Sequence, residues 1–63
     1  MTSLQSSAHK LLKQTAVEND TPIAFWATLL NKANGNVSSI TDLFSLAGFE
    51  NHDIIHVYNS LKF

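Results

Sequence analysis

Two histidines, His52 and His56, form the pair whose spacing in this 63-residue chain best suits chemistry. On a helix, residues four apart lie about one turn apart, so two imidazoles at this spacing can hold one metal ion. A stable site needs further ligands, and only His9, Glu50 or Asp53 could complete it. Nothing in the sequence fixes their approach. We therefore interpret the histidines as a solvent-facing pair, with a partner-binding or pH-sensitive role as the alternative, and expect no metal and no cofactor.

Other groups capable of catalysis lack the sequence surroundings that catalysis needs. The chain has no cysteine, which removes disulfides, thiolate zinc sites and cysteine nucleophiles. No serine stands in a Gly-x-Ser-x-Gly turn, and the five acidic residues fall mostly at turns and helix starts. A helical unit of this size also has little volume left for a pocket once its core is packed. We therefore expect that the protein is not an enzyme.

The balance of charge restricts the class of partner. Four lysines and no arginine stand against five acidic residues, which gives a formal net charge of −1. DNA-binding domains concentrate positive charge to neutralise phosphates, and arginine is their usual reader of guanine edges. The sequence therefore disfavours nucleic acid as a partner.

Length and composition indicate one folded domain over residues 1–63. Hydrophobic residues make up 44% and charged residues 14% of the chain, unlike the highly charged mixtures that stay disordered. A core of this size is close to the lower limit for independent stability, which makes self-association an option. No apolar run reaches the roughly 20 residues that span a bilayer, and the N-terminus lacks the pattern of a signal peptide. We expect a soluble cytoplasmic protein.

The stretch 21–35 predicts the helix around which the other elements are built. Its apolar residues occupy nearly every side of a 3.6-residue helix, so we expect neighbours to surround it. Thr21 is a candidate N-cap, Pro22 suits the first helical position, and Gly35 can adopt the left-handed conformation that ends a helix.

Two aromatic residues of this helix are predicted to be largely buried on different sides. We expect Trp26 to pack with Ile23 and Leu30, and Phe25 to pack with Leu29. Both expectations follow from a helix that is covered all round.

Hydrophobic spacing predicts three further short helices. The expected fold class is all-α, a compact bundle of four short helices at about 4–17, 22–34, 39–47 and 51–62. In the first helix, Ser3 is the expected N-cap, and the apolar face comprises Leu4, Ala8, Leu11, Leu12 and Thr15.

Particular residues indicate where the last two helices begin and end. Ser39 and Asp42 have the spacing of a capping box, and Gly48 is expected to end the third helix. In the fourth helix, Asp53 in the first turn and Lys62 in the last turn are placed to complement the helix dipole.

The two C-terminal helices carry more apolar side chains than 63 residues can easily hide. The candidate partner-binding residues are Leu46, Phe49, Ile55, Tyr58 and Phe63. This surplus favours a small protein–protein interaction or regulatory module that acts through an apolar surface of its C-terminal helices. The expected partner is another protein or a second copy in a homodimer, and not a membrane.

A second pattern consists of Asn-Gly-Asn-Val-Ser at 34–38, Leu-Ala-Gly-Phe at 46–49, and apolar residues at 54, 55 and 61. It resembles the C-terminal part of bacterial helix-turn-helix domains similar to the factor for inversion stimulation. The resemblance covers the C-terminal half and implies DNA binding through the last helix, with His52, Asp53, His56 and Asn59 facing the groove of the DNA.

Two features depart from that family. The segment between Ser38 and Gly48 is about one turn longer, and an acid stands where the family carries arginine and lysine. Because of these departures, DNA binding by a helix-turn-helix that uses the last helix is the alternative function and not the first choice.

The residues Asp-Leu-Phe-Ser-Leu-Ala-Gly at 42–48 are similar to the segment before the prosthetic-group serine of carrier proteins in peptide and polyketide assembly lines. In those proteins a serine follows the glycine closely. Here Phe49, Glu50 and Asn51 follow it, so the chain lacks the attachment point for a phosphopantetheine arm. The sequence predicts no carrier function.

Overall fold

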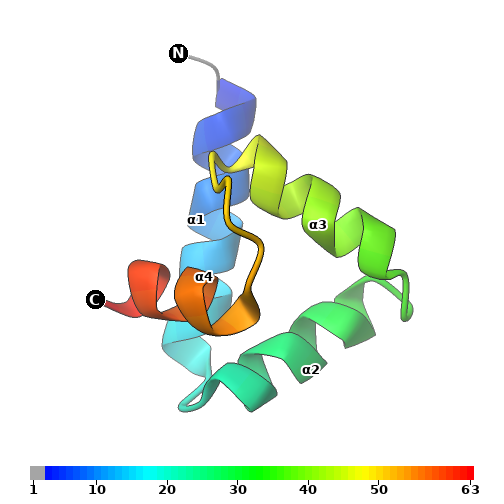
Figure 1. Cartoon of the computed structure of the whole chain (residues 1–63), viewed down its shortest axis with the longest axis vertical. Helices are drawn as coiled ribbons and strands as arrows, with labels where there is room; N and C mark the ends of the chain where they lie inside the picture. The colour runs from blue at the N-terminus through cyan, green and yellow to red at the C-terminus, as the bar shows by residue number, and fades with distance from the viewer. Residues whose placement is uncertain (1–2) are drawn as a thin grey trace.

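A computed structural model describes residues 3–63, which form four α-helices and no strand. The helices are α1 (Ser3–Glu18), α2 (Pro22–Lys32), α3 (Val37–Leu46) and α4 (Ile54–Lys62) (Figure 1). Helix α1 packs against the other three, and α2 also packs against α3 and α4. The predicted all-α bundle of four short helices is thereby confirmed. None of the described helices combines the length and the apolar character needed to cross a bilayer.

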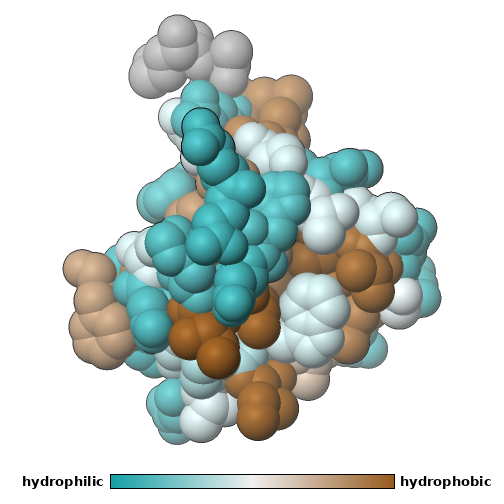
Figure 2. Space-filling view, viewed as in Figure 1, coloured by the Kyte–Doolittle hydropathy of each residue, from teal (hydrophilic) through white to brown (hydrophobic). Residues whose placement is uncertain are grey.

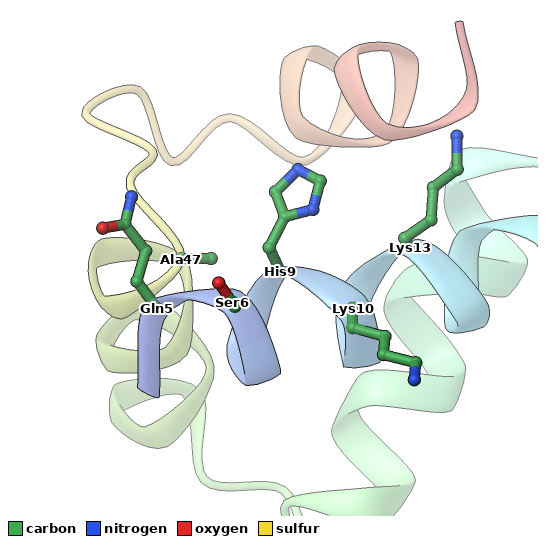
Figure 3. A pocket seen from close by; sticks show the side chains of 6 residues that line it. All are labelled: Gln5, Ser6, His9, Lys10, Lys13 and Ala47. Atoms are coloured by element: carbon green, nitrogen blue, oxygen red, sulfur yellow. The ribbon is translucent and has the colours of Figure 1, made fainter. Parts of the chain in front are cut away.

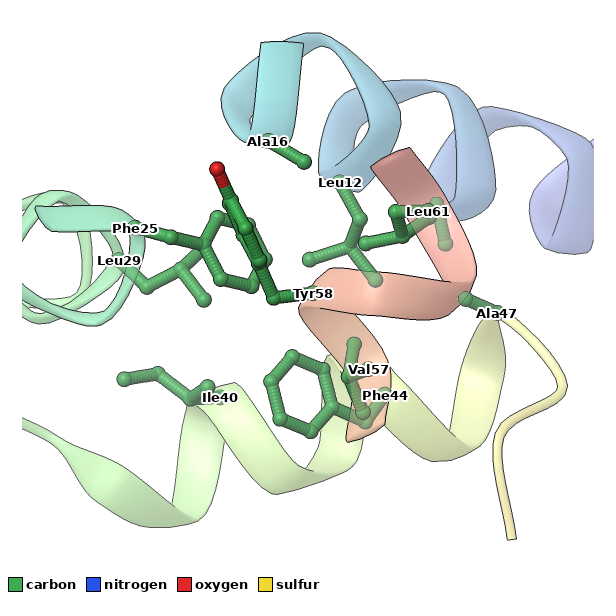
Figure 4. Packing of buried hydrophobic residues seen from close by; sticks show 11 residues of the cluster. Leu12, Ala16, Phe25, Leu29, Ile40, Phe44, Ala47, Val57, Tyr58 and Leu61 are labelled. Atoms are coloured by element: carbon green, nitrogen blue, oxygen red, sulfur yellow. The ribbon is translucent and has the colours of Figure 1, made fainter. Parts of the chain in front are cut away.

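All four helices contribute to one hydrophobic core (Figure 4). The buried apolar residues are Ala8, Leu12, Ala16, Phe25, Leu29, Ile40, Phe44, Ala47, Val57, Tyr58 and Leu61. The rings of Phe25 and Tyr58 meet at a centroid distance of 5.5 Å, which joins α2 to α4. Burying a side chain such as Phe25 contributes about 1.5–3 kcal/mol. The predicted burial of Phe25 is confirmed.

The start signals predicted for α2 are confirmed, but the helix ends at Lys32, and the first left-handed residue after it is Asn34, with φ of 55°, and not Gly35 as predicted. Thr21 Oγ1 accepts a 3.1 Å hydrogen bond from the amide of Ala24, and Pro22 is the first helical residue. After the helix, Gly35 has φ of 79° and donates its amide to the carbonyl of Leu30 at 2.8 Å. These bonds satisfy backbone groups that a helix leaves unpaired at its ends.

Helix α3 begins earlier than predicted. Its N-cap is Asn36, whose side-chain oxygen accepts the amide of Ser39 at 3.3 Å. Ser39 is therefore the third residue of the helix and not its cap. Asn36 offers the same capping chemistry three residues before the predicted helix start at residue 39.

Helix α4 begins later than the predicted residue 51. Asp53 is its N-cap and accepts the amide of Ile55 at 2.9 Å. The side chain of Asn51 in turn accepts the amide of Asp53 at 2.9 Å. Asparagine side chains of this kind stabilise a turn in competition with the helix, so residues 51–53 form the connection to α4.

The prediction that α2 is covered on nearly all sides is wrong for its first turns. Ile23 is 82% exposed, and Trp26 is only half-buried against the core. Three neighbouring helices cannot enclose a fourth on every side, and the N-terminal end of α2 is the part left open. On α1, Leu4 and Leu11 were also expected in the core and are 62% and 42% exposed.

Helix α4 is tied to the C-terminal end of α1 by polar contacts. Lys62 Nζ donates to the carbonyls of Ala16 at 3.3 Å and Asn19 at 2.8 Å. Lys13 Nζ donates in the opposite direction, from α1 to the carbonyl of Leu61. A cation is favourable beside the last carbonyls of a helix. Lys62, predicted to complement the dipole of its own helix, also binds the end of α1.

Candidate partner-binding groove

The two histidines do not form the helical pair that their spacing predicted. His52 precedes α4, and its Nε2 lies 3.0 Å from Ser45 Oγ and 3.1 Å from the carbonyl oxygen of Phe49. It is therefore turned back towards the C-terminal end of α3, while His56 is exposed on α4. Within residues 3–63 no three histidine or acidic side chains cluster in a way that could hold a metal ion.

The side chains of Ser45 and His52 meet in the connection between α3 and α4. Nε2 of His52 either donates a hydrogen bond to the carbonyl oxygen of Phe49 or accepts one from the hydroxyl of Ser45, depending on the tautomer of the imidazole. With either tautomer, the contact holds this connection against the C-terminal end of α3.

The five predicted partner-binding residues do not gather on one surface. Tyr58 belongs to the core at 4% exposure, and Phe49 is half-buried with its ring stacked on His9 at a centroid distance of 6.1 Å. The other three are exposed: Leu46 at the end of α3, Ile55 in the first turn of α4, and Phe63 directly after α4. Ile55 and Phe63 are thus separated by nearly the whole length of α4.

An apolar groove lies where the N-terminal ends of α2 and α4 meet. Its apolar lining consists of Pro22, Ile23, Trp26, Ile54 and Ile55. Thr21 and His52 complete the lining, and the volume is about 490 Å³. Figure 2 shows hydrophobic surface over this part of the molecule, beside the start of α4 and extending towards α2. We call this site the α2–α4 groove.

The helix starts explain why the groove is apolar. Thr21 and Asp53 cap their helices with side-chain oxygens, and the residues that follow each cap are hydrophobic. Ile23 and Ile55 are each the second residue of their helix, where no further neighbour covers them. Exposed apolar side chains that adjoin one another in this way mark interaction surfaces in small soluble domains.

Of the candidate partner-binding residues named from the sequence, Ile55 lines the groove, whereas the lining residues Ile23 and Trp26 were assigned to the core. The sequence did signal that some apolar residues would stay exposed, because it has more apolar helix faces than four short helices can cover. The spacing of residues alone does not show which end of α2 is left uncovered.

A second hollow, of about 560 Å³, lies along α1, and five of its six lining residues have polar or charged side chains. Its lining is Gln5, Ser6, His9, Lys10, Lys13 and Ala47, shown in Figure 3. Lys10 points away from His9 and Lys13 in this view, and Lys13 is bound to the carbonyl of Leu61. The cations diverge, so they do not form an anion site.

Comparison of the chain with protein-family models, with curated proteins and with solved structures gives no match in any of the three.

Proposed function

We propose that this protein is a small interaction module that binds another protein through the α2–α4 groove. The observation that carries the proposal is the 82% exposure of Ile23 beside the half-buried Trp26 and the 57% exposed Ile55. Fully burying one such aliphatic side chain contributes about 1.5–3 kcal/mol, so covering Ile23 and Ile55 supplies a useful part of a binding free energy. Tryptophan, the residue type of Trp26, is enriched among the residues that dominate protein interfaces.

The groove contains one of the five partner-binding residues that were predicted from the sequence. Ile55 belongs to the C-terminal helix, and α2 supplies the rest of the apolar lining. Leu46 and Phe63 remain candidates for contacts outside the groove. A regulatory role and a cytoplasmic location also remain predictions.

Several contacts weigh against the alternative of DNA binding. Lys13, Lys32 and Lys62 donate to groups within the protein, at Leu61, Thr15 and the end of α1 respectively. Lysines that close the fold are less available to neutralise phosphates. The connection between α3 and α4 covers residues 47–53, longer than the 3–4-residue turn that is typical of a helix-turn-helix motif.

The proposal is tested by site-specific photocrosslinking in lysate of the cells that make the protein. A photoreactive amino acid is placed at Ile23, at Ile55, and at Val17 on α1, which is 60% exposed and does not line the groove. We expect positions 23 and 55 to yield the same crosslinked species, and position 17 to yield none of it.

The crosslinked mass also separates the two expected partners. A product of twice the mass of the chain identifies a second copy, and any other defined mass identifies a different protein. Identical products from positions 17, 23 and 55 contradict the proposal, because the groove then has no selective role.

A further inference from the structure

We infer that the occupant of the α2–α4 groove is an amphipathic helix of a different protein, with lysine or arginine beside its apolar anchors. This inference rests on the proposed function and adds the chemistry of the partner. It is argued from the charges at the edge of the groove, from the type of lining, and from the consequences of pairing two copies.

The charged residues next to the groove are acidic. Asp20 directly precedes the lining residue Thr21, and Asp53 stands between the lining residues His52 and Ile54. Both aspartates are exposed, and no lysine lines the groove. Glu50, also exposed, lies two residues before His52. A partner with positive charge beside its apolar side chains therefore complements both the acidic residues next to the groove and the apolar lining of the groove.

The lining selects a helix over other peptide conformations. Residues 3–63 contain no strand, so no sheet edge is present to which an extended peptide could add. Proline-rich peptides bind grooves lined with aromatic side chains, whereas Trp26 is the single aromatic residue among the apolar lining. An aliphatic groove between two helix ends suits the apolar stripe of an amphipathic helix, whose anchors recur every three or four residues.

A second copy fits the groove less well. In a two-fold symmetric dimer the same patch faces itself, so Asp20 and Asp53 of both copies would meet along one seam. Like charges placed opposite one another oppose association. Pairing the groove with another surface of a second copy would give a ring or an open filament, and not a two-fold dimer.

The experiment uses Trp26 as an intrinsic probe, since it lines the groove and is the only tryptophan in the chain. Three synthetic helical peptides without tryptophan share one leucine stripe and carry lysine, glutamine or glutamate at the flanking positions. Binding is followed by Trp26 fluorescence at low and high salt. We expect the lysine peptide to bind about tenfold more tightly than the glutamate peptide at low salt, a ratio that falls as salt screens the exposed charges.

Matched variants assign the preference to the two aspartates. Asp53→Asn keeps the N-cap, because asparagine caps a helix about as well as aspartate. We expect Asp20→Asn/Asp53→Asn to lose the preference for lysine while its affinity for the glutamine peptide stays unchanged. Asp42→Asn, a comparable change on α3, serves as the control and should keep the full preference.

The outcomes distinguish failure of this inference from failure of the proposed function. Equal affinity for all three peptides, reduced by Ile23→Ser, overturns the charged partner and leaves apolar docking in place. Tighter binding of the glutamate peptide overturns the inference outright. If none of the peptides binds at concentrations up to about 1 mM, the proposed function of the groove is contradicted. A dissociation constant of about 1 mM corresponds to a binding free energy of only about −4 kcal/mol. Light scattering that shows a dimer broken by Ile23→Ser assigns the groove to a second copy.

Discussion

The hydroxyl of Tyr58 donates a 2.6 Å hydrogen bond to the backbone carbonyl of Asn19, 39 residues earlier in the chain. The same carbonyl accepts the ammonium of Lys62 at 2.8 Å, and that ammonium lies 5.3 Å from the centroid of the Tyr58 ring. One carbonyl just beyond α1 thus receives two donors from α4. This contact sets how α4 lies across the end of α1, and therefore where its first turn meets α2 to form the groove.

Removing the Tyr58 hydroxyl is expected to cost little by itself. Tyr58→Phe keeps the ring against Phe25 and leaves Lys62 on the Asn19 carbonyl, so we expect a loss of about 0.5–1.5 kcal/mol in the free energy of unfolding. Urea denaturation followed by circular dichroism measures it. In a Lys62→Met background the same change should cost more, because the carbonyl then loses both donors. Equal costs in the two backgrounds would show that the donors do not compensate for one another.

The two aromatic residues of α2 should differ in their contribution to stability. Phe25 is fully buried and Trp26 is half-buried, so Phe25→Ala is expected to cost about 3–5 kcal/mol and Trp26→Ala distinctly less. Phe25→Ala is expected to abolish the cooperative thermal transition seen by circular dichroism, and Trp26→Ala to retain it at a lower midpoint. A larger loss for Trp26→Ala than for Phe25→Ala would place Trp26 in the core.

Gly48 is held in a conformation that side chains rarely adopt. Its φ is 98°, and a Cβ there would lie 2.8 Å from Nε2 of Gln5. We expect Gly48→Ala to cost about 1–2 kcal/mol, mostly from the backbone, since the end of a glutamine side chain can move away. The urea midpoint of Gly48→Ala/Gln5→Ala, compared with that of Gln5→Ala alone, should show the same loss. Full recovery in the double variant would mean that the clash, and not φ, sets the cost.

Titration with labelled duplex DNA tests the alternative function. We expect no saturable binding below about 10 μM at low salt, because a chain with net charge −1 releases few counterions from phosphates. The His52→Ala/His56→Ala/Asn59→Ala variant should behave as the parent does. Sub-micromolar binding by the parent that disappears in this variant would favour DNA binding through α4 over protein binding through the groove.

The sequence by itself determined the fold class and the best-marked helix ends. Thr21 and Gly35 act through bonds to residues a few positions away, and Pro22 acts through its fixed φ, so their roles in α2 can be derived from local chemistry. The burial of Phe25 was predicted from the same all-round apolar pattern that wrongly placed Ile23 in the core, so that pattern did not select the buried side of α2. Where two local signals competed, as at Asn36 and Ser39, the sequence alone did not select between them, and the asparagine caps α3.

Only the tertiary structure decided which apolar residues stay outside the core. Ile23 and Phe25 are two positions apart on one hydrophobic helix, yet one is 82% exposed and the other has no exposed surface. That difference depends on which side of α2 faces the core, where Phe25 packs against Tyr58 of α4. Because 63 residues provide too few helices to enclose α2 on every side, the uncovered end of α2 and the first turn of α4 form the groove.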